Sequence, residues 1–348
     1  MLGWLLRAFR RPSPPPARTS GSVPAKVSAN GSGPVKTAEG TDPGARPTTA
    51  AVIQELVEQM GGPVGEVDTQ YWHRMAKNVI AQGQTVARPP SAFPLVASQM
   101  VQMLRDPALD LNKLVGTVQR DAGIASALLK LANSPIFAPA VAVTSLRGAI
   151  QSLGVRQVGE LVIANAGKSL YDTPSKHALE MYPTLWKSMF QEAMANAFTA
   201  GRLALDVRGG NSEIALIAGL LVDAGRPIGL QVLCELVKEG MNRPNELEAI
   251  AVLDEVAPAL GGMAVAKLEL PAELASACSP DSPSPTVDGQ IARLVTAVGA
   301  IQRRTPRIWS AASDVVRLGD QIGLSPYQVR AQFGQRTQYL ARAAAFSE

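Results

Sequence analysis

Helical periodicity dominates the chain between residues 88 and 280. Apolar residues recur there at the three- and four-residue spacing of a helix, and helix-starting and helix-ending residues divide the segments. Leu111, Leu114 and Val118, for example, fall on one helical face. No stretch alternates apolar and polar residues in the way that a half-buried strand does. This pattern predicts an all-α fold.

The composition supports the same fold class. Hydrophobic residues make up 46 % of the 348 residues, but aromatic residues make up only 5 %. Alanine, leucine and valine must therefore supply most of the core packing, and alanine and leucine are strong helix formers. We expect a compact multi-helix bundle.

Histidine and cysteine counts limit the chemistry of the chain. His73 and His177 are the only two histidines, so a histidine-rich metal centre is excluded. His73 lies beside Trp72, where a packing or surface role is expected. Cys234 and Cys278 form no CxxC motif, so neither a disulfide framework nor a cysteine zinc site is implied. A reducing cytosol fits this cysteine usage.

Changes in composition divide the chain into four segments. Residues 1–50 comprise a short basic amphipathic stretch and a Pro/Ser/Gly-rich linker, and residues 51–87 carry accessory helices. The main helical domain spans residues 88–280. A Pro/Ser-rich linker and further helices occupy residues 281–348.

The composition of the first 50 residues predicts a disordered tail. Residues 1–11, MLGWLLRAFRR, combine apolar residues at helical spacing with arginines, but are too short to span a bilayer. They predict weak contact with an anionic membrane surface or docking onto a protein, and the sequence does not separate the two. Residues 12–50 hold almost no large apolar side chain, which predicts disorder.

Charge is distributed unevenly along the chain. Residues 1–50 and 291–348 each carry five more basic than acidic side chains, whereas residues 51–290 carry six more acidic than basic ones. Nucleic-acid-binding domains concentrate lysine and arginine on one face. Because the central segment is acidic, we expect no nucleic-acid partner for it.

Four motifs in the main domain occur in the order and spacing of one family. They are Pro90 to Pro94, Asp121 with Ala122, Leu128 to Ser134 and Thr144 to Gly154. The segment that they span resembles the first half of an HDOD domain, the HD-related output domain of bacterial signalling proteins. The family-motif residues expected to be structural are Leu131, Ala132, Asn133, Ser134, Gly154, Asp223 and Gly225.

The second half of the domain is similar to the HD-like portion of that family. Metal-binding HD relatives place histidines where this chain has Ser188 and Val222, next to the retained Asp223, and a third near Asp254. Valine has no lone pair to donate to a metal. The resemblance therefore implies a degenerate HD site with no metal, no other cofactor and no catalytic residue.

Two further expectations concern the carboxylates of this region. Asp223 lies in an apolar run, where an isolated charge is costly, so Arg226 or a local hydrogen bond at a helix end is expected to compensate it. Asp254 and Glu255 are neighbours that point about 100° apart on a helix, and a solvated face is expected for them.

Taken together, these features predict a non-catalytic bacterial signal-transduction or scaffold protein. It would bind other signalling proteins in the cytosol, with peripheral contact at the inner membrane through residues 1–11. One alternative is a metal-dependent HD-type phosphohydrolase acting on nucleotides or cyclic dinucleotides. Another is a non-catalytic sensor of a small anion, for which the sequence shows no arginine-rich motif.

Overall fold

A computed structural model describes most of the chain after residue 46. The described residues are 47–64, 69–86, 103, 110–133, 142–155, 158, 159, 162, 171, 176–266, 270, 272–279 and 285–344. Every regular element among them is a helix, which confirms the all-α prediction. The predicted basic segment 1–11, almost all of the linker up to residue 50, and Ser134 lie outside the described residues.

The described helices are numbered in chain order. They are α2 (Thr49–Gln59), α3 (Thr69–Val86), α5 (Leu111–Val118), α6 (Ala122–Ala132), α7 (Leu146–Leu153), α9 (Lys176–Met181), α10 (Pro183–Ala204), α11 (Ser212–Leu221), α12 (Gly225–Lys238), α13 (Glu246–Ala266), α14 (Ala272–Cys278), α15 (Val287–Gln302), α16 (Ile308–Gln321) and α17 (Pro326–Ala344).

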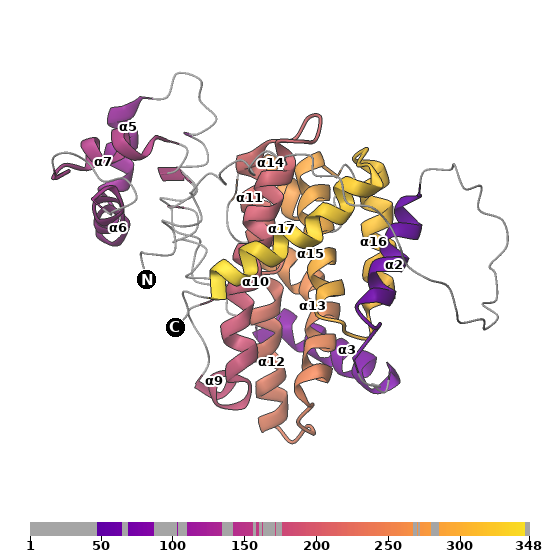
Figure 1. Cartoon of the computed structure of the whole chain (residues 1–348). Coiled ribbons are helices and arrows are strands. Elements are labelled where there is room, and N and C mark those ends of the chain that lie inside the picture. Colours follow the sequence, from indigo (N-terminus) through magenta and orange to yellow (C-terminus); the bar gives the residue numbers. More distant parts are fainter. Residues whose placement is uncertain are drawn as a thin grey trace, which may run out of the picture.

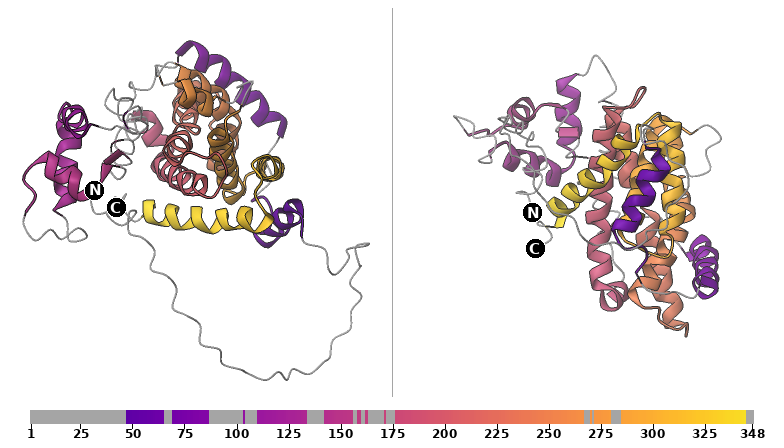
Figure 2. Two further views of the ribbon diagram at one scale, coloured as in Figure 1. Left: turned by 90° about the horizontal axis from the view of Figure 1, so that it is seen from above. Right: turned by 45° about the vertical axis from the view of Figure 1, so that its right-hand side comes forward.

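Most of these helices form one bundle, and α5, α6 and α7 form a small group beside it (Figures 1 and 2). In the bundle, α10 packs on α11, α15 and α17, while α12 packs on α13. The helix α3 lies against α12 and α13, and α2 lies against α16. The long helix α17 runs obliquely across the bundle (Figure 1).

Local capping explains where the helices of the small group begin and end. The Asp121 carboxylate accepts a hydrogen bond from the Ile124 N–H at 3.0 Å, and the Ser145 hydroxyl accepts one from the Gly148 N–H at the same distance. Both bonds satisfy backbone donors that a helix leaves free in its first turn. Gly154 ends α7 with a φ of +83°, a conformation that favours glycine. Asp, Ser and Gly are the residue types that begin and end helices in this way.

Two glycines bring the bundle helices close together. A Cβ atom on Gly219 would lie 2.9 Å from the backbone oxygen of Asn196, so α11 approaches α10 directly. A Cβ atom on Gly225 would lie 2.1 Å from the backbone oxygen of Ala257, so the start of α12 touches α13. These contacts place the ends of α11 and α12 beside the middle of α10 and α13.

The C-terminal helices pack into the same bundle. The helix α15 contacts α10, α11 and α14, and α17 contacts α10 and α15. Their apolar faces share a core with α2 and with the end of α10, through residues such as Leu203, Val295 and Val329. The helices after the linker at residue 281 therefore complete the bundle that the HD-like helices begin.

Two helical stretches, Ser212–Lys238 and Glu246–Ala266, are long and apolar enough to cross a membrane. In the bundle, 89 % and 56 % of their most apolar windows are buried against other helices. Helix packing of this kind accounts for their hydropathy, since a helix that is apolar all round suits the core of a large protein.

Candidate functional site

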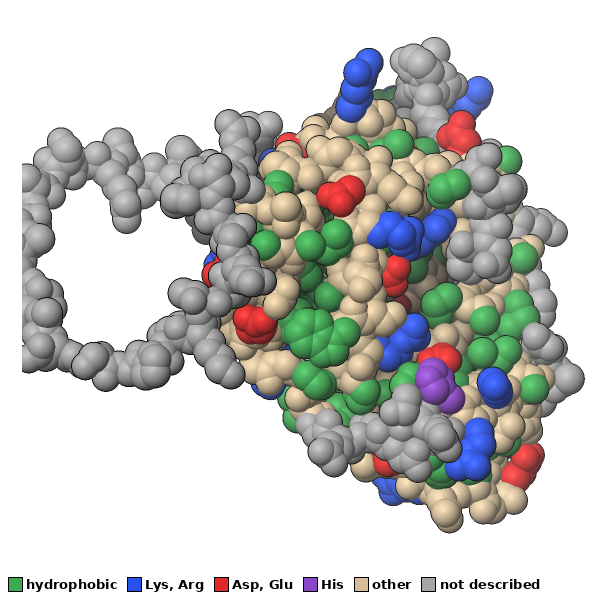
Figure 3. All heavy atoms as spheres, turned by 90° about the vertical axis from the view of Figure 1, so that its right-hand side faces the viewer, with side chains coloured by type: hydrophobic (Ala, Val, Ile, Leu, Met, Phe, Trp, Pro, Cys, Tyr) green, Lys and Arg blue, Asp and Glu red, His purple; other side chains and the backbone are tan. Residues whose placement is uncertain are grey.

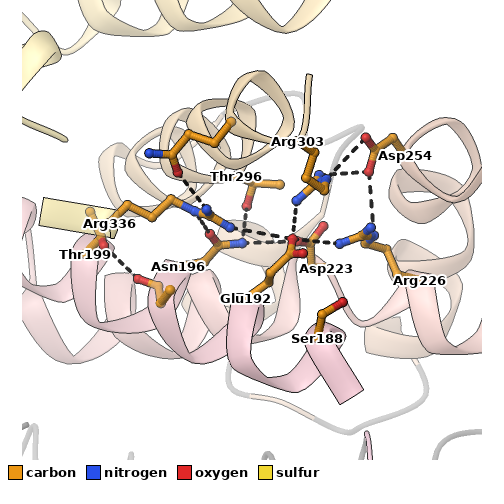
Figure 4. Close-up of polar contacts among 12 residues, drawn as sticks. Ser188, Glu192, Asn196, Thr199, Asp223, Arg226, Asp254, Thr296, Arg303 and Arg336 are labelled. Carbon is orange, nitrogen blue, oxygen red and sulfur yellow. Dashed lines mark hydrogen bonds and ion pairs between the residues drawn. The ribbon is translucent and has the colours of Figure 1, made fainter. Parts of the chain in front are cut away.

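Charged side chains meet in the interior of the bundle, beside the position expected for the degenerate HD site (Figure 4). They come from five helices and one turn: Glu192 and Asn196 on α10, Asp223 between α11 and α12, Arg226 on α12, Asp254 on α13, Arg303 at the end of α15 and Arg336 on α17. We call these seven residues the buried charge cluster. None of their side chains is more than 10 % exposed.

Three guanidinium groups form ion pairs with Glu192. Its Oε2 atom lies 3.0 Å from Nη1 of Arg226 and 3.6 Å from Nη2 of Arg336, and it also accepts a hydrogen bond from Arg303. Burial opposes ionisation of Glu192, but the positive charges of these arginines outweigh it and lower the pKa to about 2. Glu192 is therefore ionised in the folded protein at neutral pH.

Asp254 is the second paired carboxylate of the cluster. Its Oδ1 atom lies 2.8 Å from Nη2 of Arg303 and 3.6 Å from Nε of Arg226. Its side chain is only 5 % exposed, so the solvated face expected for Asp254 is wrong. The error arose because the arginine that covers Asp254 lies 49 residues further along the chain.

The neighbouring Glu255 lies at the edge of the bundle. Its Oε1 atom is 3.0 Å from Nδ1 of His73, and its side chain is 27 % exposed. The His73 ring lies 3.9 Å from the Trp72 ring, centroid to centroid. His73 thus has the packing and surface role expected of it.

Asp223 is compensated differently from the other two carboxylates. Its Oδ2 atom accepts a hydrogen bond from Nδ2 of Asn196 at 3.1 Å. Burial raises the pKa of Asp223, and the nearby arginines only partly offset that effect. The expectation that Arg226 pairs with the Asp223 carboxylate is wrong, because the Arg226 guanidinium reaches Glu192 and Asp254 instead.

Arg336 enters the cluster from the last helix. Its Nε atom donates to Oδ1 of Asn196 at 2.7 Å, and Nη1 donates to Oε1 of Gln302 at 2.7 Å. Burial lowers the pKa of Arg336 to about 10, which still leaves it charged at neutral pH. Gly299 makes room for the guanidinium, since a Cβ atom there would lie 2.5 Å from Nη2 of Arg336.

The side chains at the positions that the resemblance assigns to metal ligands do not suit an HD-type metal. Ser188 donates its hydroxyl to the backbone oxygen of Leu185 at 3.0 Å, and Val222 has no donor atom. Guanidinium groups already contact Glu192 and Asp254, and their charge would repel a divalent cation. Among the residues that the structure describes, no group of three or more His, Cys, Asp and Glu is placed to hold a metal ion.

The first three residues of the Leu-Ala-Asn-Ser motif lie at the end of α6, in the small group of helices beside the bundle (Figure 1). Leu131 and Ala132 are the last residues of α6. The Asn133 amide donates to the backbone oxygens of Leu129 and Val143, and its Oδ1 atom accepts from the Val143 N–H at 2.7 Å. Asn133 thus ties the end of α6 to the segment before α7, as expected of a helix-ending residue.

Sequence analysis missed Arg303 and Arg336, because both lie beyond the segment that resembles the HDOD domain. No local signal marks Arg336, because the space that Gly299 leaves for it arises only when α15 and α17 pack together. Arg303 follows the apolar stretch of α15 directly.

The described helices form a bundle whose interior holds carboxylates paired with arginines. The sequence profile of the HDOD domain matches residues 91–279, which is more than half of the chain. The chain therefore belongs to the HDOD domain family. This confirms the resemblance inferred from the motifs.

Solved structures with the same fold share little sequence with this chain. An HDOD domain protein of unknown function from Geobacter sulfurreducens has 15 % identity and a TM-score of 0.53, over 78 % of this chain and 96 % of that one. A protein named for metal-dependent phosphohydrolase activity, from Shewanella amazonensis SB2B, has 15 % identity and a TM-score of 0.51, over 79 % and 100 %. These solved structures match the chain significantly, whereas no curated protein matches it at the same threshold of significance.

Proposed function

We propose that this chain is a non-catalytic signal-transduction protein that acts in the bacterial cytosol by binding other proteins through its helical bundle. Membership of the HDOD domain family supports a signalling role. The observation that carries the non-catalytic part is the pairing of Glu192 and Asp254 with arginines inside the bundle.

The pairing matters because of where the positive charge comes from. In a metal-dependent hydrolase, a bound cation activates water as a Lewis acid. Here Arg226, Arg303 and Arg336 supply the positive charge instead, and a guanidinium neither coordinates nor activates a water in that way. The carboxylates that remain are held in ion pairs within a packed interior, so the site serves the stability of the bundle.

The competing function is a metal-dependent phosphohydrolase, for which the name of the Shewanella amazonensis protein is the specific observation. The two functions differ in the ligands that they require. Such an enzyme needs several imidazole or carboxylate donors at one centre, whereas this chain has Ser188 and Val222 at the former histidine positions.

Metal content and hydrolysis test the proposal together. We expect the purified protein to contain much less than one equivalent of iron, manganese or zinc by elemental analysis. We also expect no hydrolysis of a generic phosphodiester with those metals added. One full equivalent of metal that is lost in the Asp223→Ala variant, together with metal-dependent turnover, would overturn the proposal.

A further inference from the structure

A groove opens on the surface beside the buried charge cluster. It has a volume of about 190 Å³ and lies between α13 and α14 on one side and α15 and α16 on the other. Asp223 and Asp254 lie at its base, and Ala297 and Ala300 line it. The space-filling view from this side shows a hollow between two groups of Lys and Arg side chains (Figure 3).

Four arginines line this groove, and all of them come from the C-terminal helices. Arg303 and Arg307 flank the turn between α15 and α16, while Arg293 lies ten residues before the first and Arg317 ten residues after the second. Because α15 and α16 pack against each other as a hairpin, this spacing places one pair near the turn and one pair further along. Ten helical residues span about 15 Å, so the two pairs lie about 15 Å apart.

The sequence shows no arginine-rich motif because neighbouring members of the four are 4 or 10 positions apart, and only the hairpin brings them together. Arg307 donates Nη1 to the backbone oxygen of Asp254 at 2.9 Å, and Arg317 pairs through Nη2 with Asp314 at 2.6 Å. A guanidinium carries five N–H donors on three nitrogens. Each of these two contacts uses one nitrogen, so donors remain at the rim of the groove for a carboxylate.

We infer that this groove binds an extended acidic peptide of a partner protein, an inference that rests on the proposed role in protein binding. Arg307 near the turn and Arg317 further along would each receive one carboxylate side chain, and the alanine-lined stretch between them would take small residues. Arg303 is held by Glu192 and Asp254, and Arg293 donates to the backbone oxygen of Ser279 at 2.8 Å, so these two shape the groove without receiving the peptide. Arginine suits this role because its planar fork matches a carboxylate through two parallel hydrogen bonds.

The size of the groove selects an extended peptide. A strand rises about 3.3 Å per residue, so about 15 Å corresponds to acidic residues four or five positions apart. Pockets that enclose small organic ligands are larger, at roughly 300–1,000 Å³. The spacing of the arginines thus defines both the chemistry and the length of the peptide.

A peptide series tests this inference with the full-length protein. Fluorescently labelled ten-residue peptides of Ala, Gly and Ser would carry two glutamates at separations from one to eight positions, and binding would be measured by fluorescence anisotropy. We expect the tightest binding at separations of four and five, with weaker binding as salt is raised. A series with glutamine in place of glutamate should not bind.

Arginine variants locate the binding. Removing one exposed charge pair weakens an interaction by about 1.5- to fivefold, so Arg317→Ala and Arg307→Ala should each weaken binding of the best peptide by about that factor. Arg330→Ala is the matched control, because Arg330 is 45 % exposed and pairs with Glu55 away from the groove. The control should bind like the wild-type protein.

The outcomes separate this inference from the proposed function. Binding that is independent of glutamate spacing, or unchanged in Arg317→Ala, would overturn the groove assignment. So would arginine-dependent binding of inorganic pyrophosphate without any peptide binding, which would indicate a small-anion site. Failure of the peptides in a protein that contains no metal and hydrolyses nothing would leave the non-catalytic role standing.

Discussion

Glu192 is the residue on which the buried charge cluster depends most. One carboxylate oxygen is shared by Arg226, Arg303 and Arg336, which lie on three different helices. Breaking a buried ion pair costs more than the pair contributes, because the remaining charges stay buried without compensation. Changes of single side chains in the cluster should therefore have large effects of predictable sign.

Removing the charge of Glu192 should destabilise the fold strongly. We expect Glu192→Gln to lower the free energy of unfolding by about 3–5 kcal/mol, since three guanidinium groups would then face one another. Glu235→Gln is the matched control on the surface, where Glu235 pairs with Lys238, and it should change stability by less than about 0.5 kcal/mol. Urea denaturation at pH 7 measures both. Equal effects of the two changes would contradict the role of Glu192.

The pKa of Glu192 also predicts a pH dependence. This pKa is about 2 in the folded protein, against 4.5 for the free side chain. The stabilisation is therefore fully present above pH 4.5 and is lost as the pH falls through about 2, with a total on the order of 3 kcal/mol at 1.36 kcal/mol per pKa unit. Denaturation curves between pH 6 and pH 3 should show the wild-type protein losing stability faster than Glu192→Gln. A constant difference between the two proteins would contradict this assignment.

Ionisation of Asp223 should lower the stability of the fold, whereas ionisation of Glu192 raises it. Burial raises its pKa, so its ionisation costs stability as the pH rises above the usual range of an aspartate. Asp223→Asn removes that charge and keeps an oxygen that can accept the hydrogen bond from Asn196. We expect its free energy of unfolding at pH 7 to equal or exceed that of the wild-type protein. A loss of more than about 1 kcal/mol would show that the Asp223 charge is needed.

At the scale of elements, the position of each helix depends on close contacts between backbones. The start of α12 touches α13 at Gly225, and this contact holds Arg226 between Glu192 and Asp254. The sequence resemblance marked Gly225 as a structural residue of the family. The geometry supplies the reason, because any side chain there would overlap the backbone of α13.

A methyl group at Gly225 should therefore be costly. We expect Gly225→Ala to lower stability by about 1–3 kcal/mol or more, as overpacking of a core contact does. Gly334→Ala is the control, since Gly334 lies in α17 with no atom within 4 Å of its added Cβ atom. That change should raise stability by about 0.5–1 kcal/mol, because alanine favours a helix interior over glycine. Thermal denaturation distinguishes the two, and destabilisation of both to the same extent would contradict the steric argument.

At the scale of the whole molecule, the HDOD domain and the C-terminal helices pack into one bundle. Arg303 and Arg336 come from beyond residue 279, where the family match ends, yet they pair with Glu192 and Asp254 inside it. The same helices also supply the arginines of the groove. The part of the chain outside the family match therefore neutralises the interior and shapes the proposed binding surface.

Truncation at the C-terminal end should destroy the fold, whereas truncation at the N-terminal end should leave it intact. A chain that ends at residue 280 lacks Arg303 and Arg336, and its α10 and α11 expose the apolar faces on which the C-terminal helices pack. We therefore expect this chain to unfold without a cooperative transition or to aggregate. A chain that begins at Pro47 keeps every described helix and should unfold cooperatively like the full-length protein. Circular dichroism during thermal denaturation compares them. Cooperative unfolding of the first truncation would show that the C-terminal helices are dispensable.

The sequence alone determined the features that depend on neighbouring residues. Helical periodicity, the caps at Asp121 and Ser145, and the stop at Gly154 act within a few residues, so the pattern contains all the information that they need. The absence of imidazole side chains at Ser188 and Val222 is equally visible, because it requires only the identity of the residues. That these are ligand positions stays a prediction from the family resemblance.

Only the tertiary structure decided which charges meet. Arg226 and Glu192 are 34 positions apart, Arg303 and Glu192 are 111 apart, and Arg336 and Asn196 are 140 apart. Spacing along a chain does not encode contacts over such distances, because they depend on how the helices pack. Asp254 was expected on a solvated face because its partner Arg303 comes from a helix that the local pattern does not place. Helix packing also brings four scattered arginines to one groove, and the physical reason in both cases is that packing fixes the distances between charges while sequence fixes only their order.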